Sequence, residues 1–158
     1  MPRETFDTKI TQVQSEIYIL GSMVEQAVLD ATNTLRTRDL EEAQRIFEED
    51  ALINEKRFAL ENAIIILLGT QQPFARDLRL LAAMLIVVNE LERMADYAKG
   101  IAKINIKIGK SDIDIPVRQF QKMAEQGVSM LHRSLDAFLK QNPNQAAAIP
   151  QEDDIVDD

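Results

Sequence analysis

The chain has 158 residues, of which 46% are hydrophobic and 28% are charged. It has no cysteine and a single histidine, which excludes disulfides, zinc–thiolate sites, iron–sulfur clusters and any metal site that needs two imidazoles. The 26 acidic and 18 basic residues give a net charge of −8, so we expect no nucleic-acid partner. Any metal ion would be held mainly by carboxylates, which favour hard cations.

The hydropathy of the chain is that of a protein without membrane spans. Its longest apolar run, Leu80–Val88, has nine residues, whereas roughly 20 are needed to cross a bilayer. The first residues, Met1–Glu4, are polar and contain no apolar signal-peptide segment. We therefore expect a cytoplasmic protein that does not insert into a membrane.

Apolar residues recur every three or four positions in long segments, which predicts helices over about 5–37, 39–68 and 74–108. A fourth helix is predicted over about 115–141, and a fifth begins after Pro143 and falters at Pro150. The short alternating stretch at 104–108 is interpreted as a helix end, and that at 113–115 as a connector. Asp39 is the predicted N-cap of the second helix. Because short connections make neighbouring helices antiparallel, we expect an all-α fold with an elongated antiparallel three-helix bundle.

A weak internal repeat suggests how the rest of the chain is organised. A shift of 103 residues places Leu35 on Phe138 and Glu49–Asp50 on Glu152–Asp153. This divides the chain into a complete bundle, 1–109, and a partial second repeat, 110–158, which holds the fourth helix, the start of a fifth and an acidic end. A partial bundle leaves an apolar face uncovered, which either meets a partner chain or stays mobile, and we expect a homodimer or a higher oligomer.

Two charged residues interrupt the apolar pattern of the second helix. Asp50 and Arg57 occupy positions where the spacing asks for apolar residues, and Asn54 lies one turn from Asp50. A lone buried carboxylate is costly, so Asp50 must meet a cation, a metal ion or strong hydrogen-bond donors.

The third helix carries a matching polar stripe of Asn89, Glu92 and Asp96. Glu92 and Asp96 are four residues apart and repel each other. Arg93 could relieve part of this repulsion, and a divalent or trivalent cation would relieve more. Two interpretations stay open: a carboxylate metal site shared with Asp50 and Asn54, or a solvated charged face.

The start of the third helix concentrates charge in Arg76, Asp77 and Arg79. Asp77 suits the first turn, where the helix dipole is positive, and Arg79 is then free to reach a carboxylate on a neighbouring helix. The simpler interpretation is a charge pair at a helix start. His132 is expected to be a structural residue. No phosphate-binding glycine loop, nucleophile elbow or Ser/His/Asp set occurs, so we expect no enzyme.

Several segments resemble the PhoU family of phosphate-signalling regulators. The most specific are 73–80 (PFARDLRL) and 90–96 (ELERMAD), and 23–26 (MVEQ), 131–138 (LHRSLDAF) and 152–157 (EDDIVD) fit as well. The resemblance covers essentially the whole chain. It implies a fold of two homologous three-helix bundles, of which only the first is complete here.

The resemblance also implies a function. It suggests a negative regulator of phosphate uptake and phosphate-starvation signalling, which links a phosphate ABC transporter ATPase to a sensor histidine kinase. Such a protein would be cytoplasmic and would reach the inner membrane through these partners. Arg76, Asp77, Arg79 and Arg93 would then contact a partner or support the motif.

Members of the family can bind metal clusters through E/D-x-x-x-D motifs. Carried over to this chain, the motif is Glu92 with Asp96, its partner is Asp50 with Asn54, and the counterpart in the second repeat is Asp153 with Asp157. The cation would be iron, zinc, manganese, magnesium or calcium.

Three departures from the family pattern weaken the metal-site expectation. Ala95 stands where the family usually has glycine, and Asn54 stands where a second acid would complete the motif. The second repeat lacks its own copy of 90–96, so a second site cannot form within one chain. The alternatives are a carboxylate-bridged metal-binding or metal-storage protein and a purely structural helical adaptor.

Overall fold

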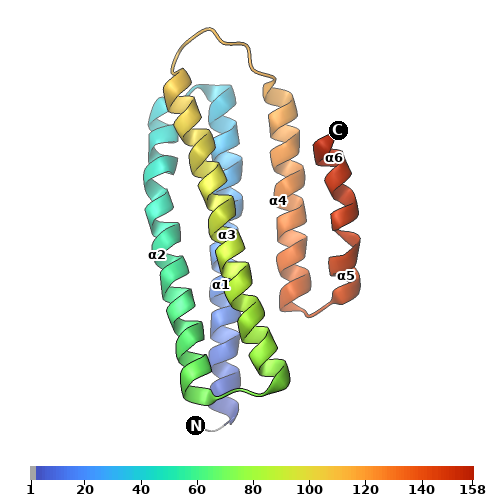
Figure 1. Cartoon of the computed structure of the whole chain (residues 1–158). Helices are drawn as coiled ribbons and strands as arrows, with labels where there is room; N and C mark the ends of the chain where they lie inside the picture. Colours follow the sequence, from blue (N-terminus) through green and yellow to red (C-terminus); the bar gives the residue numbers. More distant parts are fainter. Residues whose placement is uncertain (1–2) are drawn as a thin grey trace.

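The computed structural model describes residues 3–158, and all regular structure in this range is helical (Figure 1). The long helices are α1 (Arg3–Thr37), α2 (Leu40–Gln71), α3 (Ala75–Ile108) and α4 (Val117–Leu139). The chain ends in α5 (Pro143–Ala148), a 3₁₀ turn η1 (Pro150–Glu152) and α6 (Asp153–Asp157). The all-α prediction is confirmed, and the predicted ends of the long helices lie within three residues of the observed ones. Met1 and Pro2, part of the polar start noted above, lie outside the described residues.

Local chemistry explains where these helices begin and end. The Asp39 carboxylate caps α2 by accepting a hydrogen bond from the Glu42 backbone N–H at 3.0 Å. Gly109 ends α3 with a φ of 58°, a conformation that glycine adopts without the steric cost of a side chain. The alternating stretch at 104–108 belongs to α3, and residues 113–115 form part of the connector to α4, as predicted.

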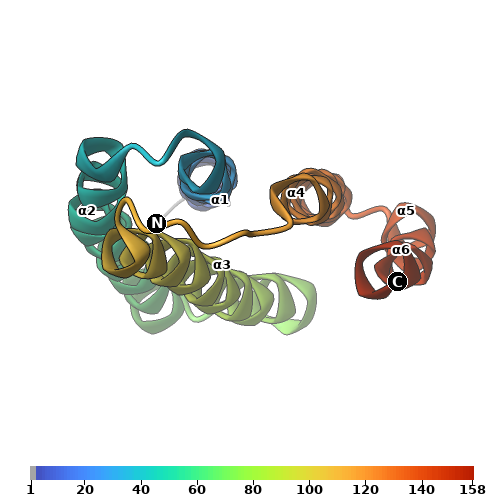
Figure 2. The same cartoon turned by 90° about the horizontal axis from the view of Figure 1, so that it is seen from above.

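The first three helices form an antiparallel bundle, seen end-on in Figure 2 as three neighbouring coils. Their apolar stripes meet in a common core. The largest side chains that are completely buried there come from all three helices: Ile17, Leu20, Val24, Ile64, Leu81, Met84, Val88 and Leu91. Burial of these stripes supplies most of the apolar core of the chain.

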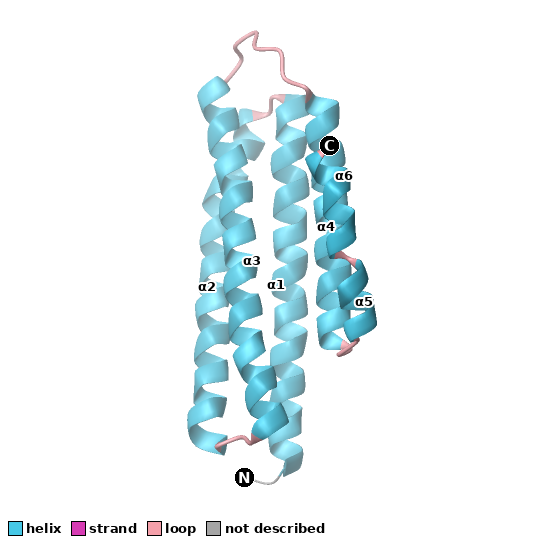
Figure 3. Cartoon of the chain, turned by 45° about the vertical axis from the view of Figure 1, so that its right-hand side comes forward, coloured by secondary structure: helices cyan, strands magenta, loops and turns pink. Residues whose placement is uncertain are grey.

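The remaining helices form an arm, residues 117–157, on one side of this bundle. Helix α4 packs along α1, on the side of α1 that faces away from α2 (Figure 2). Helices α5 and α6 then double back along α4 (Figures 1 and 3). Within α4, only Leu135 and Ala137 are buried, while Phe120 and Met123 are exposed. Assembly of the chain into an oligomer stays a prediction.

None of the helices between residues 3 and 158 combines the length and the apolar content that a membrane span requires.

Candidate functional site

Asp50 is buried between α2 and α3, with 4% of its surface exposed. Its Oδ2 accepts hydrogen bonds from Lys99 Nζ and from Asn54 Nδ2, both at 3.2 Å. The buried carboxylate therefore meets a cation and a donor, as its position in the apolar pattern required. Lys99 was not predicted as the partner of Asp50. Its ammonium group also lies 4.9 Å from the centre of the Phe47 ring.

Glu92 and Asp96 lie together on the face of α3 beside Asp50. Burial raises the pKa of the Glu92 carboxyl, and the neighbouring Asp96 charge raises it further. The positive charge of Arg57 opposes this rise, while Asp50 adds to it. The structure thus brings three of the predicted site residues into electrostatic contact, with Arg57 as a countercharge.

Arg57 is half-buried, in keeping with its place in the apolar pattern of α2. Its Nη1 donates a hydrogen bond to Glu61 Oε1 at 2.9 Å, and its guanidinium lies 4.0 Å from the centre of the Phe58 ring. Arg57 therefore acts on two carboxylates, Glu61 and Glu92.

The side chains predicted to bind a metal ion do not form a coordination site in this structure. Among residues 3–158, no three Asp, Glu or His side chains are placed so that they could hold a metal ion. Lys99 and Asn54 already satisfy Oδ2 of Asp50. Asp153 and Asp157 are exposed on α6, which lies beyond α4 from the bundle (Figure 2). Metal binding by these residues stays a prediction.

The charged motif at the start of α3 is only partly as expected. Asp77 lies in the first turn of α3, as predicted. Arg76 Nη2 donates a hydrogen bond to Gln141 Oε1 at 2.6 Å, which joins the bundle to the turn after α4. Arg79 is exposed, and none of the ion pairs among residues 3–158 involves it, so its expected contact with a neighbouring carboxylate is not observed.

Arg93 also pairs differently from the expectation. Its Nη1 lies 3.2 Å from the Glu90 carboxylate, and both side chains are well exposed. The expected relief of Asp96 by Arg93 is therefore wrong. Arg93 is three residues from both acids, and it pairs with Glu90, whereas Asp96 interacts with Glu92 one turn earlier.

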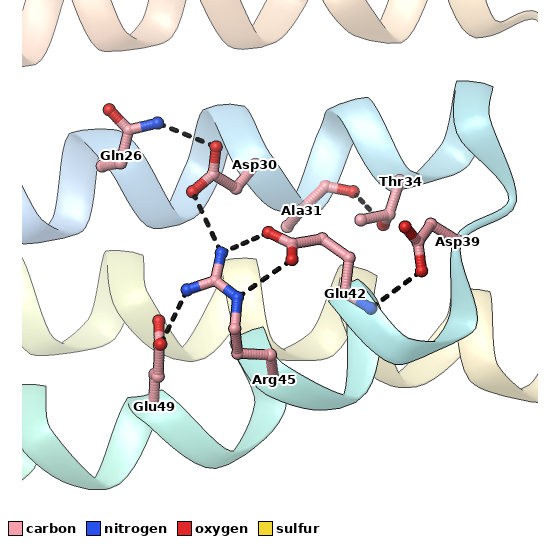
Figure 4. A network of polar contacts seen from close by, with 8 residues as sticks. All are labelled: Gln26, Asp30, Ala31, Thr34, Asp39, Glu42, Arg45 and Glu49. Carbon is pink, nitrogen blue, oxygen red and sulfur yellow. Dashed lines mark hydrogen bonds and ion pairs between the residues drawn. The ribbon is translucent and has the colours of Figure 1, made fainter.

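A cluster centred on Arg45 was not predicted as a site (Figure 4). Arg45 donates hydrogen bonds to Glu42 and Glu49, the latter at 2.6 Å, and lies 4.0 Å from the Asp30 carboxylate of α1. Gln26 donates to Asp30 at 2.8 Å. The carboxylates raise the pKa of the Arg45 guanidinium. The spacing of Glu42 and Glu49 from Arg45 was visible in the sequence, whereas the contribution of Asp30 depends on the packing of α1 against α2.

His132 makes the main polar contact between α4 and α1. Its Nδ1 lies 3.1 Å from Glu25 Oε1, and its ring meets Tyr18 edge-on with centroids 6.3 Å apart. These contacts fit the structural role expected for His132. Glu25 is 107 residues away in sequence, so local spacing could not have found it.

Comparison with known proteins identifies the family to which this chain belongs. Residues 17–104, from the middle of α1 to the end of α3, match the family model of the PhoU domain. The chain belongs to the PhoU family. The resemblance deduced from residues 73–80 and 90–96 is confirmed.

Curated relatives and solved structures agree with the PhoU assignment. The phosphate-specific transport system accessory protein PhoU of Edwardsiella tarda is 30% identical over 96% of this chain and 63% of its own length. The PhoU homolog of Clostridium acetobutylicum is 33% identical over 99% of this chain and 72% of its own length. The crystal structure of PhoU from Pseudomonas aeruginosa superposes with a TM-score of 0.89, at 29% identity over 96% of this chain and 73% of that one. The phosphate transport system regulatory protein PhoU from Streptococcus pneumoniae gives a TM-score of 0.88.

The alignment coverages also show what share of a PhoU protein this chain spans. The chain spans less than two thirds of the Edwardsiella tarda relative. The PhoU domain match contains Asp50, Asn54, Glu92 and Asp96, whereas residues 105–158 lie beyond it. The superpositions nevertheless extend over 96% of the chain, so most of the arm also follows the PhoU fold.

Proposed function

We propose that this PhoU-family protein is a negative regulator of phosphate uptake and phosphate-starvation signalling. In this role it is an adaptor without catalytic activity, which contacts a phosphate ABC transporter ATPase and a sensor histidine kinase. It would act in the cytoplasm and reach the inner membrane through these partners. The observation that carries the proposal is the PhoU domain match over 17–104, together with relatives named as accessory proteins of phosphate-specific transport.

The test is deletion of the gene, with a phosphate-starvation reporter measured in phosphate-rich medium. We expect the reporter to become constitutively active, and expression of the full 158-residue chain to restore repression. Co-precipitation with the kinase or the ATPase should accompany the restored repression. Unchanged signalling after deletion would rule the regulator out.

A second candidate is metal binding by the carboxylates of α2 and α3. It is favoured by the raised pKa of Glu92, whose burial and like-charged neighbours Asp96 and Asp50 are conditions that a cation relieves. Bound metal would be held by Glu92 and Asp96, and Asp50 would first have to release Lys99.

Elemental analysis of protein purified without chelators distinguishes the metal-binding candidate from a plain adaptor. We expect stoichiometric metal that is lost in a Glu92→Ala/Asp96→Ala variant and kept in a Glu90→Ala control. Absence of metal, with signalling unaffected by replacement of Asp50, Glu92 and Asp96, would favour the purely structural adaptor.

A further inference from the structure

The seam between α1 and α2 is hollowed along most of its length. One hollow, of about 840 Å³, lies between residues 7–16 of α1 and 56–67 of α2. A second, of about 430 Å³, lies between residues 18–30 of α1 and 46–53 of α2, and reaches α3 at Ala95 and Ala98. Because the two helices are antiparallel, the hollows lie end to end along one seam, which we call the α1–α2 groove. The stretch of α1 that borders it is about 35 Å long at 1.5 Å per residue.

Apolar side chains line this groove and remain open to solvent. Tyr18, Ile19, Leu52 and Ile66 all line it and are about half exposed. Within the described chain, α4 does not cover the groove, because it packs on the side of α1 away from α2 (Figure 2). Exposed apolar residues that gather along one groove mark an interaction surface.

The charge around the groove selects the chemistry of its occupant. Helices α1 and α2 together carry 12 acidic and six basic residues, whereas α3 carries six basic and four acidic ones. Asp30, Glu49 and Asp50 line the second hollow with one basic residue, Lys99, whereas Asp7 and Glu16 of the first hollow are balanced by Lys9 and Lys56. Both hydrogen bonds of buried Asp50 end on Oδ2, and none among residues 3–158 ends on Oδ1. The groove thus offers carboxylate acceptors beside apolar surface.

We propose that the α1–α2 groove binds an amphipathic helix of a partner protein, whose apolar stripe is flanked by lysine or arginine residues. A helix of about 23 residues matches the length of the groove, and its apolar side chains at i, i+3, i+4 and i+7 would enter the two hollows. Its basic side chains would compete with Arg45 for Asp30 and Glu49. The proposal rests on the adaptor function proposed above and deepens it, by stating which face docks a partner and what that partner presents.

Two neighbouring isoleucines provide a matched test. Ile66 lines the groove and is 59% exposed, whereas Ile65 is 55% exposed and does not line it. Leu52 and Phe58 form a second pair on α2, at 55% and 57% exposure, of which only Leu52 lines the groove. Lysine at any of these positions stays in solvent, so both double variants should fold.

The probe is a fluorescein-labelled synthetic helix of about 23 residues, with a leucine stripe flanked by lysines, and its binding to the 158-residue chain is followed by anisotropy. We expect the Leu52→Lys/Ile66→Lys variant to bind it at least ~10-fold more weakly than the wild type. The Phe58→Lys/Ile65→Lys variant should bind like the wild type. A peptide with the same leucine stripe and glutamates in place of lysines should bind far more weakly, and added salt should weaken the lysine peptide.

Several results would overturn the proposal. These are no binding of the lysine peptide to the wild type, equal loss in both double variants, or equal binding of the glutamate peptide. Sedimentation adds another: if only Leu52→Lys/Ile66→Lys converts a dimer into monomers, a second copy of the chain occupies the groove instead. The peptide assay needs no cell, so it can fail while the deletion phenotype holds, and the reverse.

Discussion

The three-helix bundle and the arm are held in place by different forces. In the bundle, each helix contributes completely buried apolar side chains, such as Leu20, Ile64 and Leu91. In the arm, α4 buries only Leu135 and Ala137, and the chain after it is tied to α4 by polar pairs such as Arg133 with Glu152. A region with few buried contacts opens at a lower free energy than one with a full core. The arm should therefore detach or fray while the bundle stays folded.

The largest effect should follow from a cavity in the bundle. Leu20 is completely buried, so Leu20→Ala removes apolar contacts and leaves a void, at a cost of about 2–5 kcal/mol in the free energy of unfolding. Urea denaturation followed by circular dichroism measures this loss. The control is Leu52→Ala, at an exposed position of α2, which should change the stability far less. A similar loss in both variants would show that burial in the bundle is not what sets its stability.

A smaller effect is expected from a substitution at the contact between the bundle and the arm. A Cβ atom at Gly21 of α1 would lie 2.2 Å from Leu135 Cδ1 of α4, so the Leu135 side chain occupies the space that Gly21 leaves open. Gly21→Val should displace this buried side chain and loosen α4 at a cost of about 1–3 kcal/mol. Amide exchange should therefore accelerate in α4 and stay slow in α2 and α3.

Two further variants test whether the contact between residue 21 and Leu135 is responsible. Leu135→Ala added to Gly21→Val should restore part of the protection in α4, because it removes the atom that clashes. Gly100→Val is the matched control, since nothing lies within 4 Å of a Cβ atom there. If Gly100→Val accelerated exchange in α4 as much as Gly21→Val does, crowding at Leu135 would not be the cause.

The sequence predicted the helices well, because their signals are local. Asp39 is the cap that its type and position indicated, and the three- and four-residue spacing identified the buried faces of α1, α2 and α3. The same spacing predicted that Asp50 would be buried, since it interrupts an apolar series. Gly21 shows the limit of such signals. A glycine inside a helix gives no local reason for its presence, and the reason lies on α4.

The partners of the charged residues could not be predicted for the same physical reason. Periodicity gives the face of a helix, whereas a pair such as Asp50 with Lys99 also depends on the register between two antiparallel helices. Where an acid and a base share one helix, several combinations satisfy the spacing. Arg93 lies three residues from both Glu90 and Asp96, and the structure pairs it with Glu90.

A local effect is expected where the arm folds back on itself. Arg133 Nη1 donates a hydrogen bond to Glu152 Oε1 at 2.6 Å, and Gln126 donates to the same carboxylate at 2.9 Å. Arg133→Gln should loosen η1 and α6 from α4, because the fold-back loses its ion pair, and amide exchange there should become a few-fold faster. The pair of Lys140 with Asp136 lies within one stretch of chain, so Lys140→Gln is the control and should leave η1 unchanged. Arg133 also lowers the pKa of Glu152, so the contact should weaken as pH falls through that pKa.

The smallest effect concerns the carboxylates of the bundle and has a defined sign. Burial, followed by the charge of Asp96, raises the pKa of Glu92 above its usual value of 4.5. Between the usual and the raised pKa the folded protein holds the proton more tightly, so stability falls as pH rises through this window. Glu92→Gln should therefore stabilise the bundle at neutral pH by a few tenths of a kcal/mol, and the gain should vanish at a pH below the usual value.

Glu90→Gln, on the exposed face of the same helix, provides the comparison for this gain. Glu90 pairs with Arg93 in solvent, so its replacement should give no gain at any pH. Urea denaturation of both variants at neutral and acidic pH measures the difference. A gain for Glu92→Gln that persists at acidic pH would contradict an ionised, crowded Glu92 as its source. A loss at neutral pH would mean that the attraction of Glu92 to Arg57 outweighs its burial and its repulsion from Asp96, and the case for a cation at this face would then lose its support.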